Sequence, residues 1–189
     1  MLTDITLRLT KEQCEKISTS VEVAEFCHTG THLDIMEQTF PVEYLKRDGI
    51  AFDVRGVENR EIGCSDLDIS LVEKDMFVAL FTDFGSKHPF GSTEYAKNYP
   101  AVSHELIFAL TDKDVAIIGV DCAGLRHGDE HQNTDAYCAG RASFVLENLC
   151  NLGSLFSNGE KTARFVAYTF PLSLSGMSGL PCRVAAEKI

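Results

Sequence analysis

The 189-residue sequence predicts an α/β fold in a single domain spanning residues 1–189. Two continuous apolar runs, at 76–84 and 115–121, are typical of strands buried at the centre of a sheet. Between these runs, Ser103 precedes apolar residues at helical spacing, which predicts a capped helix over 103–110. The chain has no repeat, low-complexity tract or change in composition that would mark a second domain.

The first half of the chain is expected to be mostly strand. Residues 4–10 and 20–26 alternate between apolar and polar side chains, which is the period of a half-buried strand. Pro41 opens a segment suited to one helical turn, and Asp48-Gly49 is a common turn dipeptide. The expected elements up to residue 72 are a strand at 4–10, a short helix or turn at 11–17, a strand at 20–26, a helical turn at 41–47, a strand at 50–57, and a strand or short helix at 66–72.

The second half is expected to alternate between strands, loops and helices. Residues 85–100 are polar, aromatic and rich in Gly and Pro, which is typical of a long functional loop. Thr134 is a suitable cap for a helix that follows it. The expected elements after residue 84 are a loop at 85–100, a helix at 103–110, a strand at 115–121, a loop at 122–133, a helix at 134–143, a strand at 163–172 and a last short strand at 183–186.

The composition argues against several classes of function. The formal net charge is −11, from 17 Lys+Arg and 28 Asp+Glu, and no basic run is present. Neither nucleic acid nor an anionic membrane is therefore an expected partner. No long apolar run predicts a membrane span, and the first residues lack the apolar core of a signal peptide, so we expect a cytoplasmic protein. The seven cysteines lack paired spacing and are expected to be mostly buried and free.

His28, His32 and Asp34 place three good metal ligands within a short segment. In extended backbone, where side chains repeat with a period of two, all three fall on one face, whereas a helix would turn Asp34 away. Gly30 lies between the histidines and leaves room where the imidazoles converge. Two imidazoles and a carboxylate suit Zn²⁺, and also Mn²⁺ or Fe²⁺, and three protein ligands leave a position for water. The alternative is three polar residues on an exposed strand.

The segment His28-Thr-Gly-Thr-His-Leu-Asp34 resembles the signature of the cyclase family, which includes bacterial kynurenine formamidase and isatin hydrolase. The resemblance extends over most of the chain, in the same order. Its further blocks are Asp4-Ile-Thr6, Asp75 to Gly85 with the aromatic residues of the loop that follows, Ile118-Gly-Val-Asp121, Glu147-Asn-Leu-Cys-Asn-Leu152, and Gly179-Leu-Pro-Cys-Arg183.

This resemblance implies a swivelling β/β/α fold, with a mixed or barrel-like central sheet, peripheral helices and a homodimer or higher homo-oligomer. It also implies a divalent-metal-dependent amide hydrolase with Zn or Mn as cofactor. The implied substrate is a small-molecule amide or formamide: N-formylkynurenine, from tryptophan catabolism, for an arylformamidase, or a cyclic amide. In the formamidases a metal-bound water attacks the formyl or lactam carbonyl.

Two positions depart from the family pattern. Gln38 stands where the family has a His that serves as a second-metal ligand or general base, and a neutral amide cannot accept a proton at pH 7. Asp135 stands where a second family His precedes Glu147, and His127 and His131 lie nearby as alternative sources of an imidazole. The resemblance assigns His28, His32 and Asp34 to the first metal, Asp135 and Glu147 to further metal ligation or proton transfer, and Gln38 to orienting substrate or water.

The remaining candidates concern the substrate pocket and the type of reaction. Phe84 and Phe90 are candidates to line the pocket, with simple packing as the alternative. Arg183 is a candidate clamp for a substrate carboxylate, with a surface ion pair as the alternative. Asp121, at the end of a buried strand, is expected either to cap the next loop or to line the site. The missing histidines leave open a family member that binds a metal or small molecule without hydrolysis, and a lyase is a third reading.

Overall fold

The computed structural model describes residues 2–10, 12–13 and 26–189, and the elements expected at 11–17 and 20–26 lie almost entirely outside these ranges. The strands are β1 (Leu2–Asp4), β2 (His32–Asp34), β3 (Lys46–Asp53), β4 (Phe77–Phe81), β5 (Ile117–Val120), β6 (Phe144–Glu147), β7 (Thr162–Pro171) and β8 (Gly179–Lys188). They form one mixed sheet in the order β1-β8-β2-β6-β5-β4-β3-β7. Because β7 also pairs with β8, seven strands close into a barrel, and β1 lies outside it on β8.

Strands β3, β4, β5 and β6 run parallel, and every residue of β4, β5 and β6 is buried. This agrees with their apolar sequences, since parallel strands are covered on both faces. The short strand β2 is inserted between β6 and β8 and is antiparallel to both, with His32 opposite Glu147 on one side and Pro181 on the other. The sheet therefore sets a histidine beside a carboxylate from a distant part of the chain.

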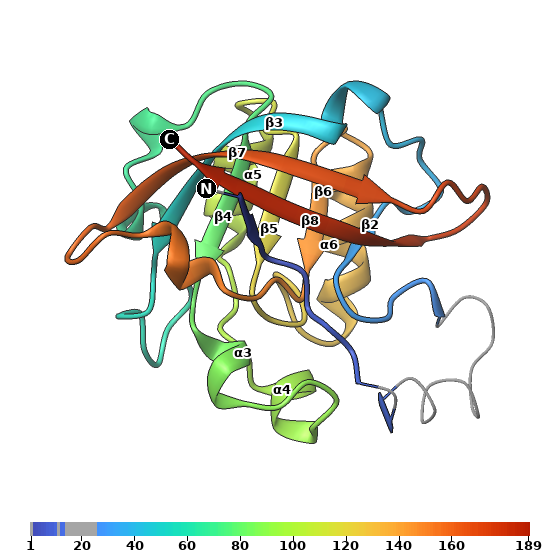
Figure 1. Ribbon diagram of the computed structural model, residues 1–189, viewed down its shortest axis with the longest axis horizontal. Coiled ribbons are helices and arrows are strands. Elements are labelled where there is room, and N and C mark those ends of the chain that lie inside the picture. The colour runs from blue at the N-terminus through green and yellow to red at the C-terminus, as the bar shows by residue number, and fades with distance from the viewer. Residues whose placement is uncertain (1, 11, 14–25) are drawn as a thin grey trace.

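The helices cover one side of the sheet and one end of it. They are α3 (Phe84–Lys87), α4 (Thr93–Lys97), α5 (His104–Thr111) and α6 (Asp129–Ala139), with short 3-10 helices η1 (Val42–Leu45), η2 (Cys64–Asp66), η3 (Ile69–Leu71) and η4 (Leu152–Leu155). In Figure 1, α5 and α6 lie behind the sheet, on the side away from β7 and β8, while α3 and α4 lie together below it. No helix in the described part of the chain is long and apolar enough to cross a membrane.

Two apolar clusters hold these layers together. One fills the barrel, where the Phe77 and Phe165 rings meet edge-on with their centroids 5.6 Å apart. The other lies between the sheet and α5, and contains Val78 and Leu106. Successive residues of β4 enter different clusters, because side chains alternate across a strand. A helix-covered mixed barrel-like sheet of this kind is the fold class expected from the sequence.

Several local expectations are confirmed and others are wrong. Ser103 caps α5 by accepting a hydrogen bond from the Leu106 amide, as its position predicts. Asp48-Gly49 is not a turn but lies inside β3. A Cβ on Gly49 would stand 2.5 Å from the Phe165 ring, so this glycine serves close packing rather than a change of direction. Of the strand or short helix expected at 66–72, the structure has the helix, in the form of the 3-10 helices η2 and η3.

The two expected loops also contain regular structure. The segment 85–100 carries most of α3 and all of α4, and α6 starts at Asp129 rather than after Thr134. Gly128 precedes α6 without a side-chain cap, so the N-cap position of this helix has no Ser, Thr, Asn or Asp. The first strand, Leu2–Asp4, shares only Asp4 with the strand expected at 4–10.

Asp121, just after β5, caps the turn that follows β4. Its carboxylate accepts hydrogen bonds from the Thr82 amide at 2.9 Å, the Thr82 hydroxyl at 2.6 Å and the Asp83 amide at 2.7 Å. Burial raises the pKa of Asp121 to about 6, although these hydrogen bonds act in the opposite direction. Between its unfolded pKa of 3.8 and about 6, the folded protein binds this proton more tightly than the unfolded chain does.

Stability contributed by Asp121 should therefore fall as pH rises from about 4 to about 6. By 1.36 kcal/mol per pKa unit, wild type should lose about 2 to 3 kcal/mol relative to Asp121→Asn across this range. Urea unfolding of both proteins from pH 4 to 7, at constant metal content, measures the difference. A stability difference that stays constant with pH would contradict this titration.

Candidate metal centre

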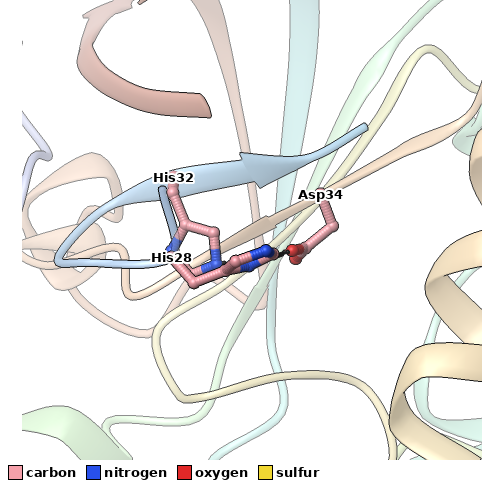
Figure 2. A group of neighbouring side chains, drawn as sticks. All are labelled: His28, His32 and Asp34. Carbon is pink, nitrogen blue, oxygen red and sulfur yellow. Dashed lines mark ion pairs between the residues drawn. The ribbon is translucent and has the colours of Figure 1, made fainter. Parts of the chain in front are cut away.

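His28, His32 and Asp34 converge around the entry to β2 and form what we call the first triad. The Asp34 Oδ1 atom lies 2.9 Å from His28 Nδ1 and 3.5 Å from His32 Nε2. Figure 2 shows both imidazoles directed toward the Asp34 carboxylate. His28 is not on the strand as expected: it lies in a turn, and Gly30, with a φ of +67°, reverses the chain so that His28 returns to the same cavity.

His131, Asp135 and Glu147 form a second triad beside the first. His131 and Asp135 are one turn apart on α6, and Glu147 ends β6. The His131 Nε2 atom lies 3.3 Å from Asp135 Oδ2 and 3.3 Å from Glu147 Oε1. The other Glu147 oxygen, Oε2, lies 3.5 Å from His32 Nε2, so Glu147 faces both triads. Within each triad, one ligand atom per residue lies within 4.8 Å of the others.

The three carboxylates of these triads are almost completely buried. Burial raises the pKa of Asp135, which the nearby Asp34 carboxylate raises further, to about 9. Burial, with the charges of Asp34 and Asp135, also raises the pKa of Glu147 well above its ordinary value. At Asp34 burial acts in the same direction, but His32 and His28 outweigh it and hold the pKa below the usual range.

Two fully buried carboxylate oxygens at this centre have no hydrogen-bond partner within the described residues. They are Asp34 Oδ2 and Glu147 Oε1, and the 3.3 Å contact of the latter with His131 is an ion-pair distance without hydrogen-bond geometry. A buried carboxylate without a partner is costly, and a divalent cation supplies the missing charge. The residues therefore fit a metal ion, because they offer suitable donor atoms and because two of their oxygens lack hydrogen-bond partners.

The imidazoles of His32 and His131 are each oriented with one ring nitrogen free for a ligand. His32 Nδ1 lies 2.9 Å from the Gly30 carbonyl oxygen, and His131 Nδ1 lies 3.1 Å from the Arg126 carbonyl oxygen. A carbonyl oxygen only accepts, so each Nδ1 carries the proton and each Nε2 presents its lone pair. Nε2 is the atom that points at the carboxylates in both triads. This is the arrangement in which metal-binding histidines are usually held.

Both triads open into one cavity of about 430 Å³. Its wall combines the six triad side chains with apolar groups that include Met36, Phe90 and Ala123. A volume of this size suits a small organic molecule, and mixed polar and apolar walls are typical of such sites.

The comparisons with known proteins agree with this fold. The family model named Cyclase, described as "Putative cyclase", matches residues 3–127, which is more than half of the chain. This chain belongs to the Cyclase family.

Solved structures of similar fold cover nearly the whole Cyclase-family chain. A "potential metal-dependent hydrolase with cyclase activity" is 22% identical with a TM-score of 0.73, covering 100% of this chain and 98% of its own. Isatin hydrolase A from Labrenzia aggregata is 17% identical with a TM-score of 0.75, covering 98% and 93%. A predicted metal-dependent hydrolase from Bacillus stearothermophilus is 21% identical with a TM-score of 0.71, covering 98% and 97%. No curated protein matches the chain.

The structure brings most of the predicted site residues of this Cyclase-family chain together. His28, His32, Asp34, Asp135 and Glu147 all line the cavity, with Phe90 in its wall. Three of the predicted residues, Gln38, Phe84 and Arg183, are not among the residues that line it.

Gln38 is exposed on the surface, outside the cavity wall. Met36 and Glu37 both have positive φ values, 46° and 66°, and this tight turn carries the chain away after Asp34. Phe84 is buried and stacks on His88 with centroids 4.2 Å apart, so it packs rather than lines this cavity. Arg183 lies on β8 and pairs with Asp4 at 2.8 Å, which is the surface ion pair considered as its alternative.

The sequence left His131 as one of two alternative histidines, and the structure places it in the second triad. The other, His127, bonds to the Tyr99 carbonyl oxygen at 2.8 Å and does not line the cavity. The signal for His131 is its separation of four residues from Asp135, which places both on one helix face. In a loop, which is what the sequence predicts for residues 122–133, a separation of four residues does not indicate that two side chains share a face.

Proposed function

We propose that this chain is a divalent-metal-dependent hydrolase of amides or formamides. The observation that carries the proposal is the pair of His and carboxylate triads that face one cavity, with Glu147 of the second triad in contact with His32 of the first. His28, His32 and Asp34 would hold one ion, with Zn²⁺ or Mn²⁺ suited to these donors. A bound ion of this kind supplies Lewis-acid activation of a carbonyl and of water.

The protein's own groups have distinct roles in this proposal. Glu147, buried between His32 and His131, holds the two triads at a fixed separation. Asp135 and His131 line the cavity beside the first triad, and we assign them to passing a proton to the leaving nitrogen. The apolar side chains of Met36 and Phe90 would shelter the ring of an aryl or cyclic substrate from water.

Within this class, we propose an arylformamidase that acts on N-formylkynurenine, or a hydrolase of a cyclic amide. The chain shares its fold with isatin hydrolases, whose name describes the opening of a cyclic amide. We further propose that it works as a homodimer or higher homo-oligomer, which light scattering on the purified protein would measure.

Metal exchange tests the proposed function. The protein is stripped with a chelator, reloaded with Zn²⁺ or Mn²⁺, and assayed by elemental analysis and with N-formylkynurenine and isatin. We expect stoichiometric metal and hydrolysis that disappears on stripping. A protein that takes up neither ion after reloading contradicts the proposal.

Two further outcomes of the same assay separate the alternatives. Binding of metal without turnover of either substrate would favour a family member that has lost hydrolysis. This is the second candidate because Gln38, which stands in place of a family histidine, is exposed and leaves the cavity without that imidazole. Product formed in H₂¹⁸O without incorporation of the label would favour a lyase. Both outcomes overturn the hydrolase.

A further inference from the structure

Asn148 occupies a buried position at the point where the two triads meet. It follows Glu147 directly at the end of β6 and is only 3% exposed. Its φ of 57° lies in the left-handed region, which Asn tolerates better than most residues. Its amide donates to the Cys122 carbonyl oxygen at 3.0 Å, and its carbonyl oxygen accepts from the Thr31 hydroxyl at 2.7 Å. The backbone of Asn148 is therefore fixed from both sides.

The Asn148 side chain connects the first triad to the cavity wall. Its Nδ2 atom donates to the Gly30 carbonyl oxygen at 3.0 Å, and its Oδ1 atom accepts from the Tyr95 hydroxyl at 2.7 Å. The orientation of the amide follows from chemistry, because a carbonyl oxygen only accepts and so must face the NH₂ group. Tyr95, from α4, lines the cavity but is only 4% exposed.

The Gly30 carbonyl oxygen is the shared hydrogen-bond acceptor of the Asn148 amide group and the His32 ring. His32 Nδ1 lies 2.9 Å from this oxygen, and Asn148 Nδ2 lies 3.5 Å from His32 Nδ1. Gly30 sits in a turn with a φ of +67°, and His32 follows it on the short strand β2. The direction of the carbonyl therefore depends on its hydrogen bonds, and the tautomer and ring angle of His32 depend on the carbonyl.

We propose that Asn148 is a positioning residue that fixes His32 for metal binding, and that Tyr95 acts through Asn148. The proposal rests on His32 being a metal ligand, as in the proposed function, but it does not require hydrolysis. Neither residue belongs to a triad. Their effect is on the orientation of the ring that does.

Cobalt binding measures this effect, because the visible absorption of Co²⁺ reports the geometry of its ligands. Asn148→Gly removes the side chain and keeps a residue that accepts positive φ. Tyr95→Phe removes only the hydroxyl. We expect Asn148→Gly to weaken Co²⁺ binding by about 10- to 100-fold, as for other partners of ligating histidines, and to change the absorption spectrum. Tyr95→Phe should weaken binding about threefold to tenfold.

The double variant separates positioning from general stability. If Tyr95 acts through Asn148, Tyr95→Phe should have no further effect on Co²⁺ affinity in the Asn148→Gly background. Tyr168→Phe is the matched control, since its hydroxyl bonds to Glu187 Oε2 at 3.1 Å, away from the cavity. It should bind Co²⁺ as wild type does.

A second readout does not depend on affinity. In the zinc-loaded wild-type protein, nitrogen NMR should show His32 with its proton on Nδ1, and Asn148→Gly should lose or broaden that signal. Wild-type affinity and spectrum in Asn148→Gly would overturn the positioning role, as would additive effects in the double variant. Failure of the wild-type protein to bind Co²⁺ would instead count against the proposed function.

Discussion

Replacing His32 with Ala is expected to abolish metal binding and hydrolysis together. His32 is 2% exposed, and its Nε2 atom lies 3.5 Å from both Asp34 Oδ1 and Glu147 Oε2. Loss of this imidazole removes a ligand from the first triad and the contact that joins it to the second. The affinity for Zn²⁺ should fall by more than about 100-fold, the upper end of the effect of outer-shell partners. Elemental analysis after dialysis and the hydrolysis assay measure the two losses.

His104→Ala is the control for this experiment. His104 is exposed at the start of α5, pairs with Glu130 at 3.7 Å, and contributes no atom to the cavity wall. Its replacement should leave metal content and turnover unchanged. Full metal content in His32→Ala would show that the first triad is not the metal-binding site.

Gly124→Ala is expected to disable the second triad without replacing any of its three residues. Gly124 has a φ of +136°, and a Cβ there would stand 2.5 Å from His131 Cε1 and 2.9 Å from Glu147 Oε1. The half-exposed imidazole is the group that can yield, so His131 should swing away from Asp135 and Glu147. We expect turnover to fall by about 100-fold, with a loss in stability of about 1–3 kcal/mol from the backbone alone. Steady-state kinetics and urea unfolding measure these effects.

Gly159→Ala is the control that separates two effects of Gly124→Ala: the backbone strain of placing Ala at a positive φ, and the clash of the new Cβ with His131. Gly159 also has a positive φ, +81°, but a Cβ there would meet nothing within 4 Å. It should lose stability to a similar extent and keep its activity. Equal activity in the two variants would show that His131 does not need its present position.

The sequence could predict the first triad because its residues are close together in the chain. The spacing of His28, His32 and Asp34 indicates a shared site whether His28 lies on a strand or, as here, in a turn. The barrel-like mixed sheet followed from the resemblance and from the buried runs that became β4 and β5. The buried strands depend on local patterns, which periodicity reports, whereas the barrel-like closure of the sheet was implied by the resemblance alone.

The second triad depends on tertiary structure and was harder to predict. His131 joins Asp135 only because α6 begins at Asp129, after an uncapped Gly128. Gln38 was placed at the site by its position in a motif, but a turn with positive φ values directs it outward. Arg183 is satisfied by Asp4, a partner 179 residues away that no local pattern indicates. In each case the decisive contact lies outside the segment that suggested the role.

The position of β2 has a consequence for the order of folding during synthesis. This strand carries His32 and Asp34 from near the start of the chain, yet one of its edges pairs with residues 179–181 near the end. A growing chain cannot complete this pairing until residues 179–181 have left the ribosome. Contacts between such distant segments also slow folding. We therefore expect nascent chains that lack β8 to retain no metal, and cation capture to be a late event that follows closure of the barrel.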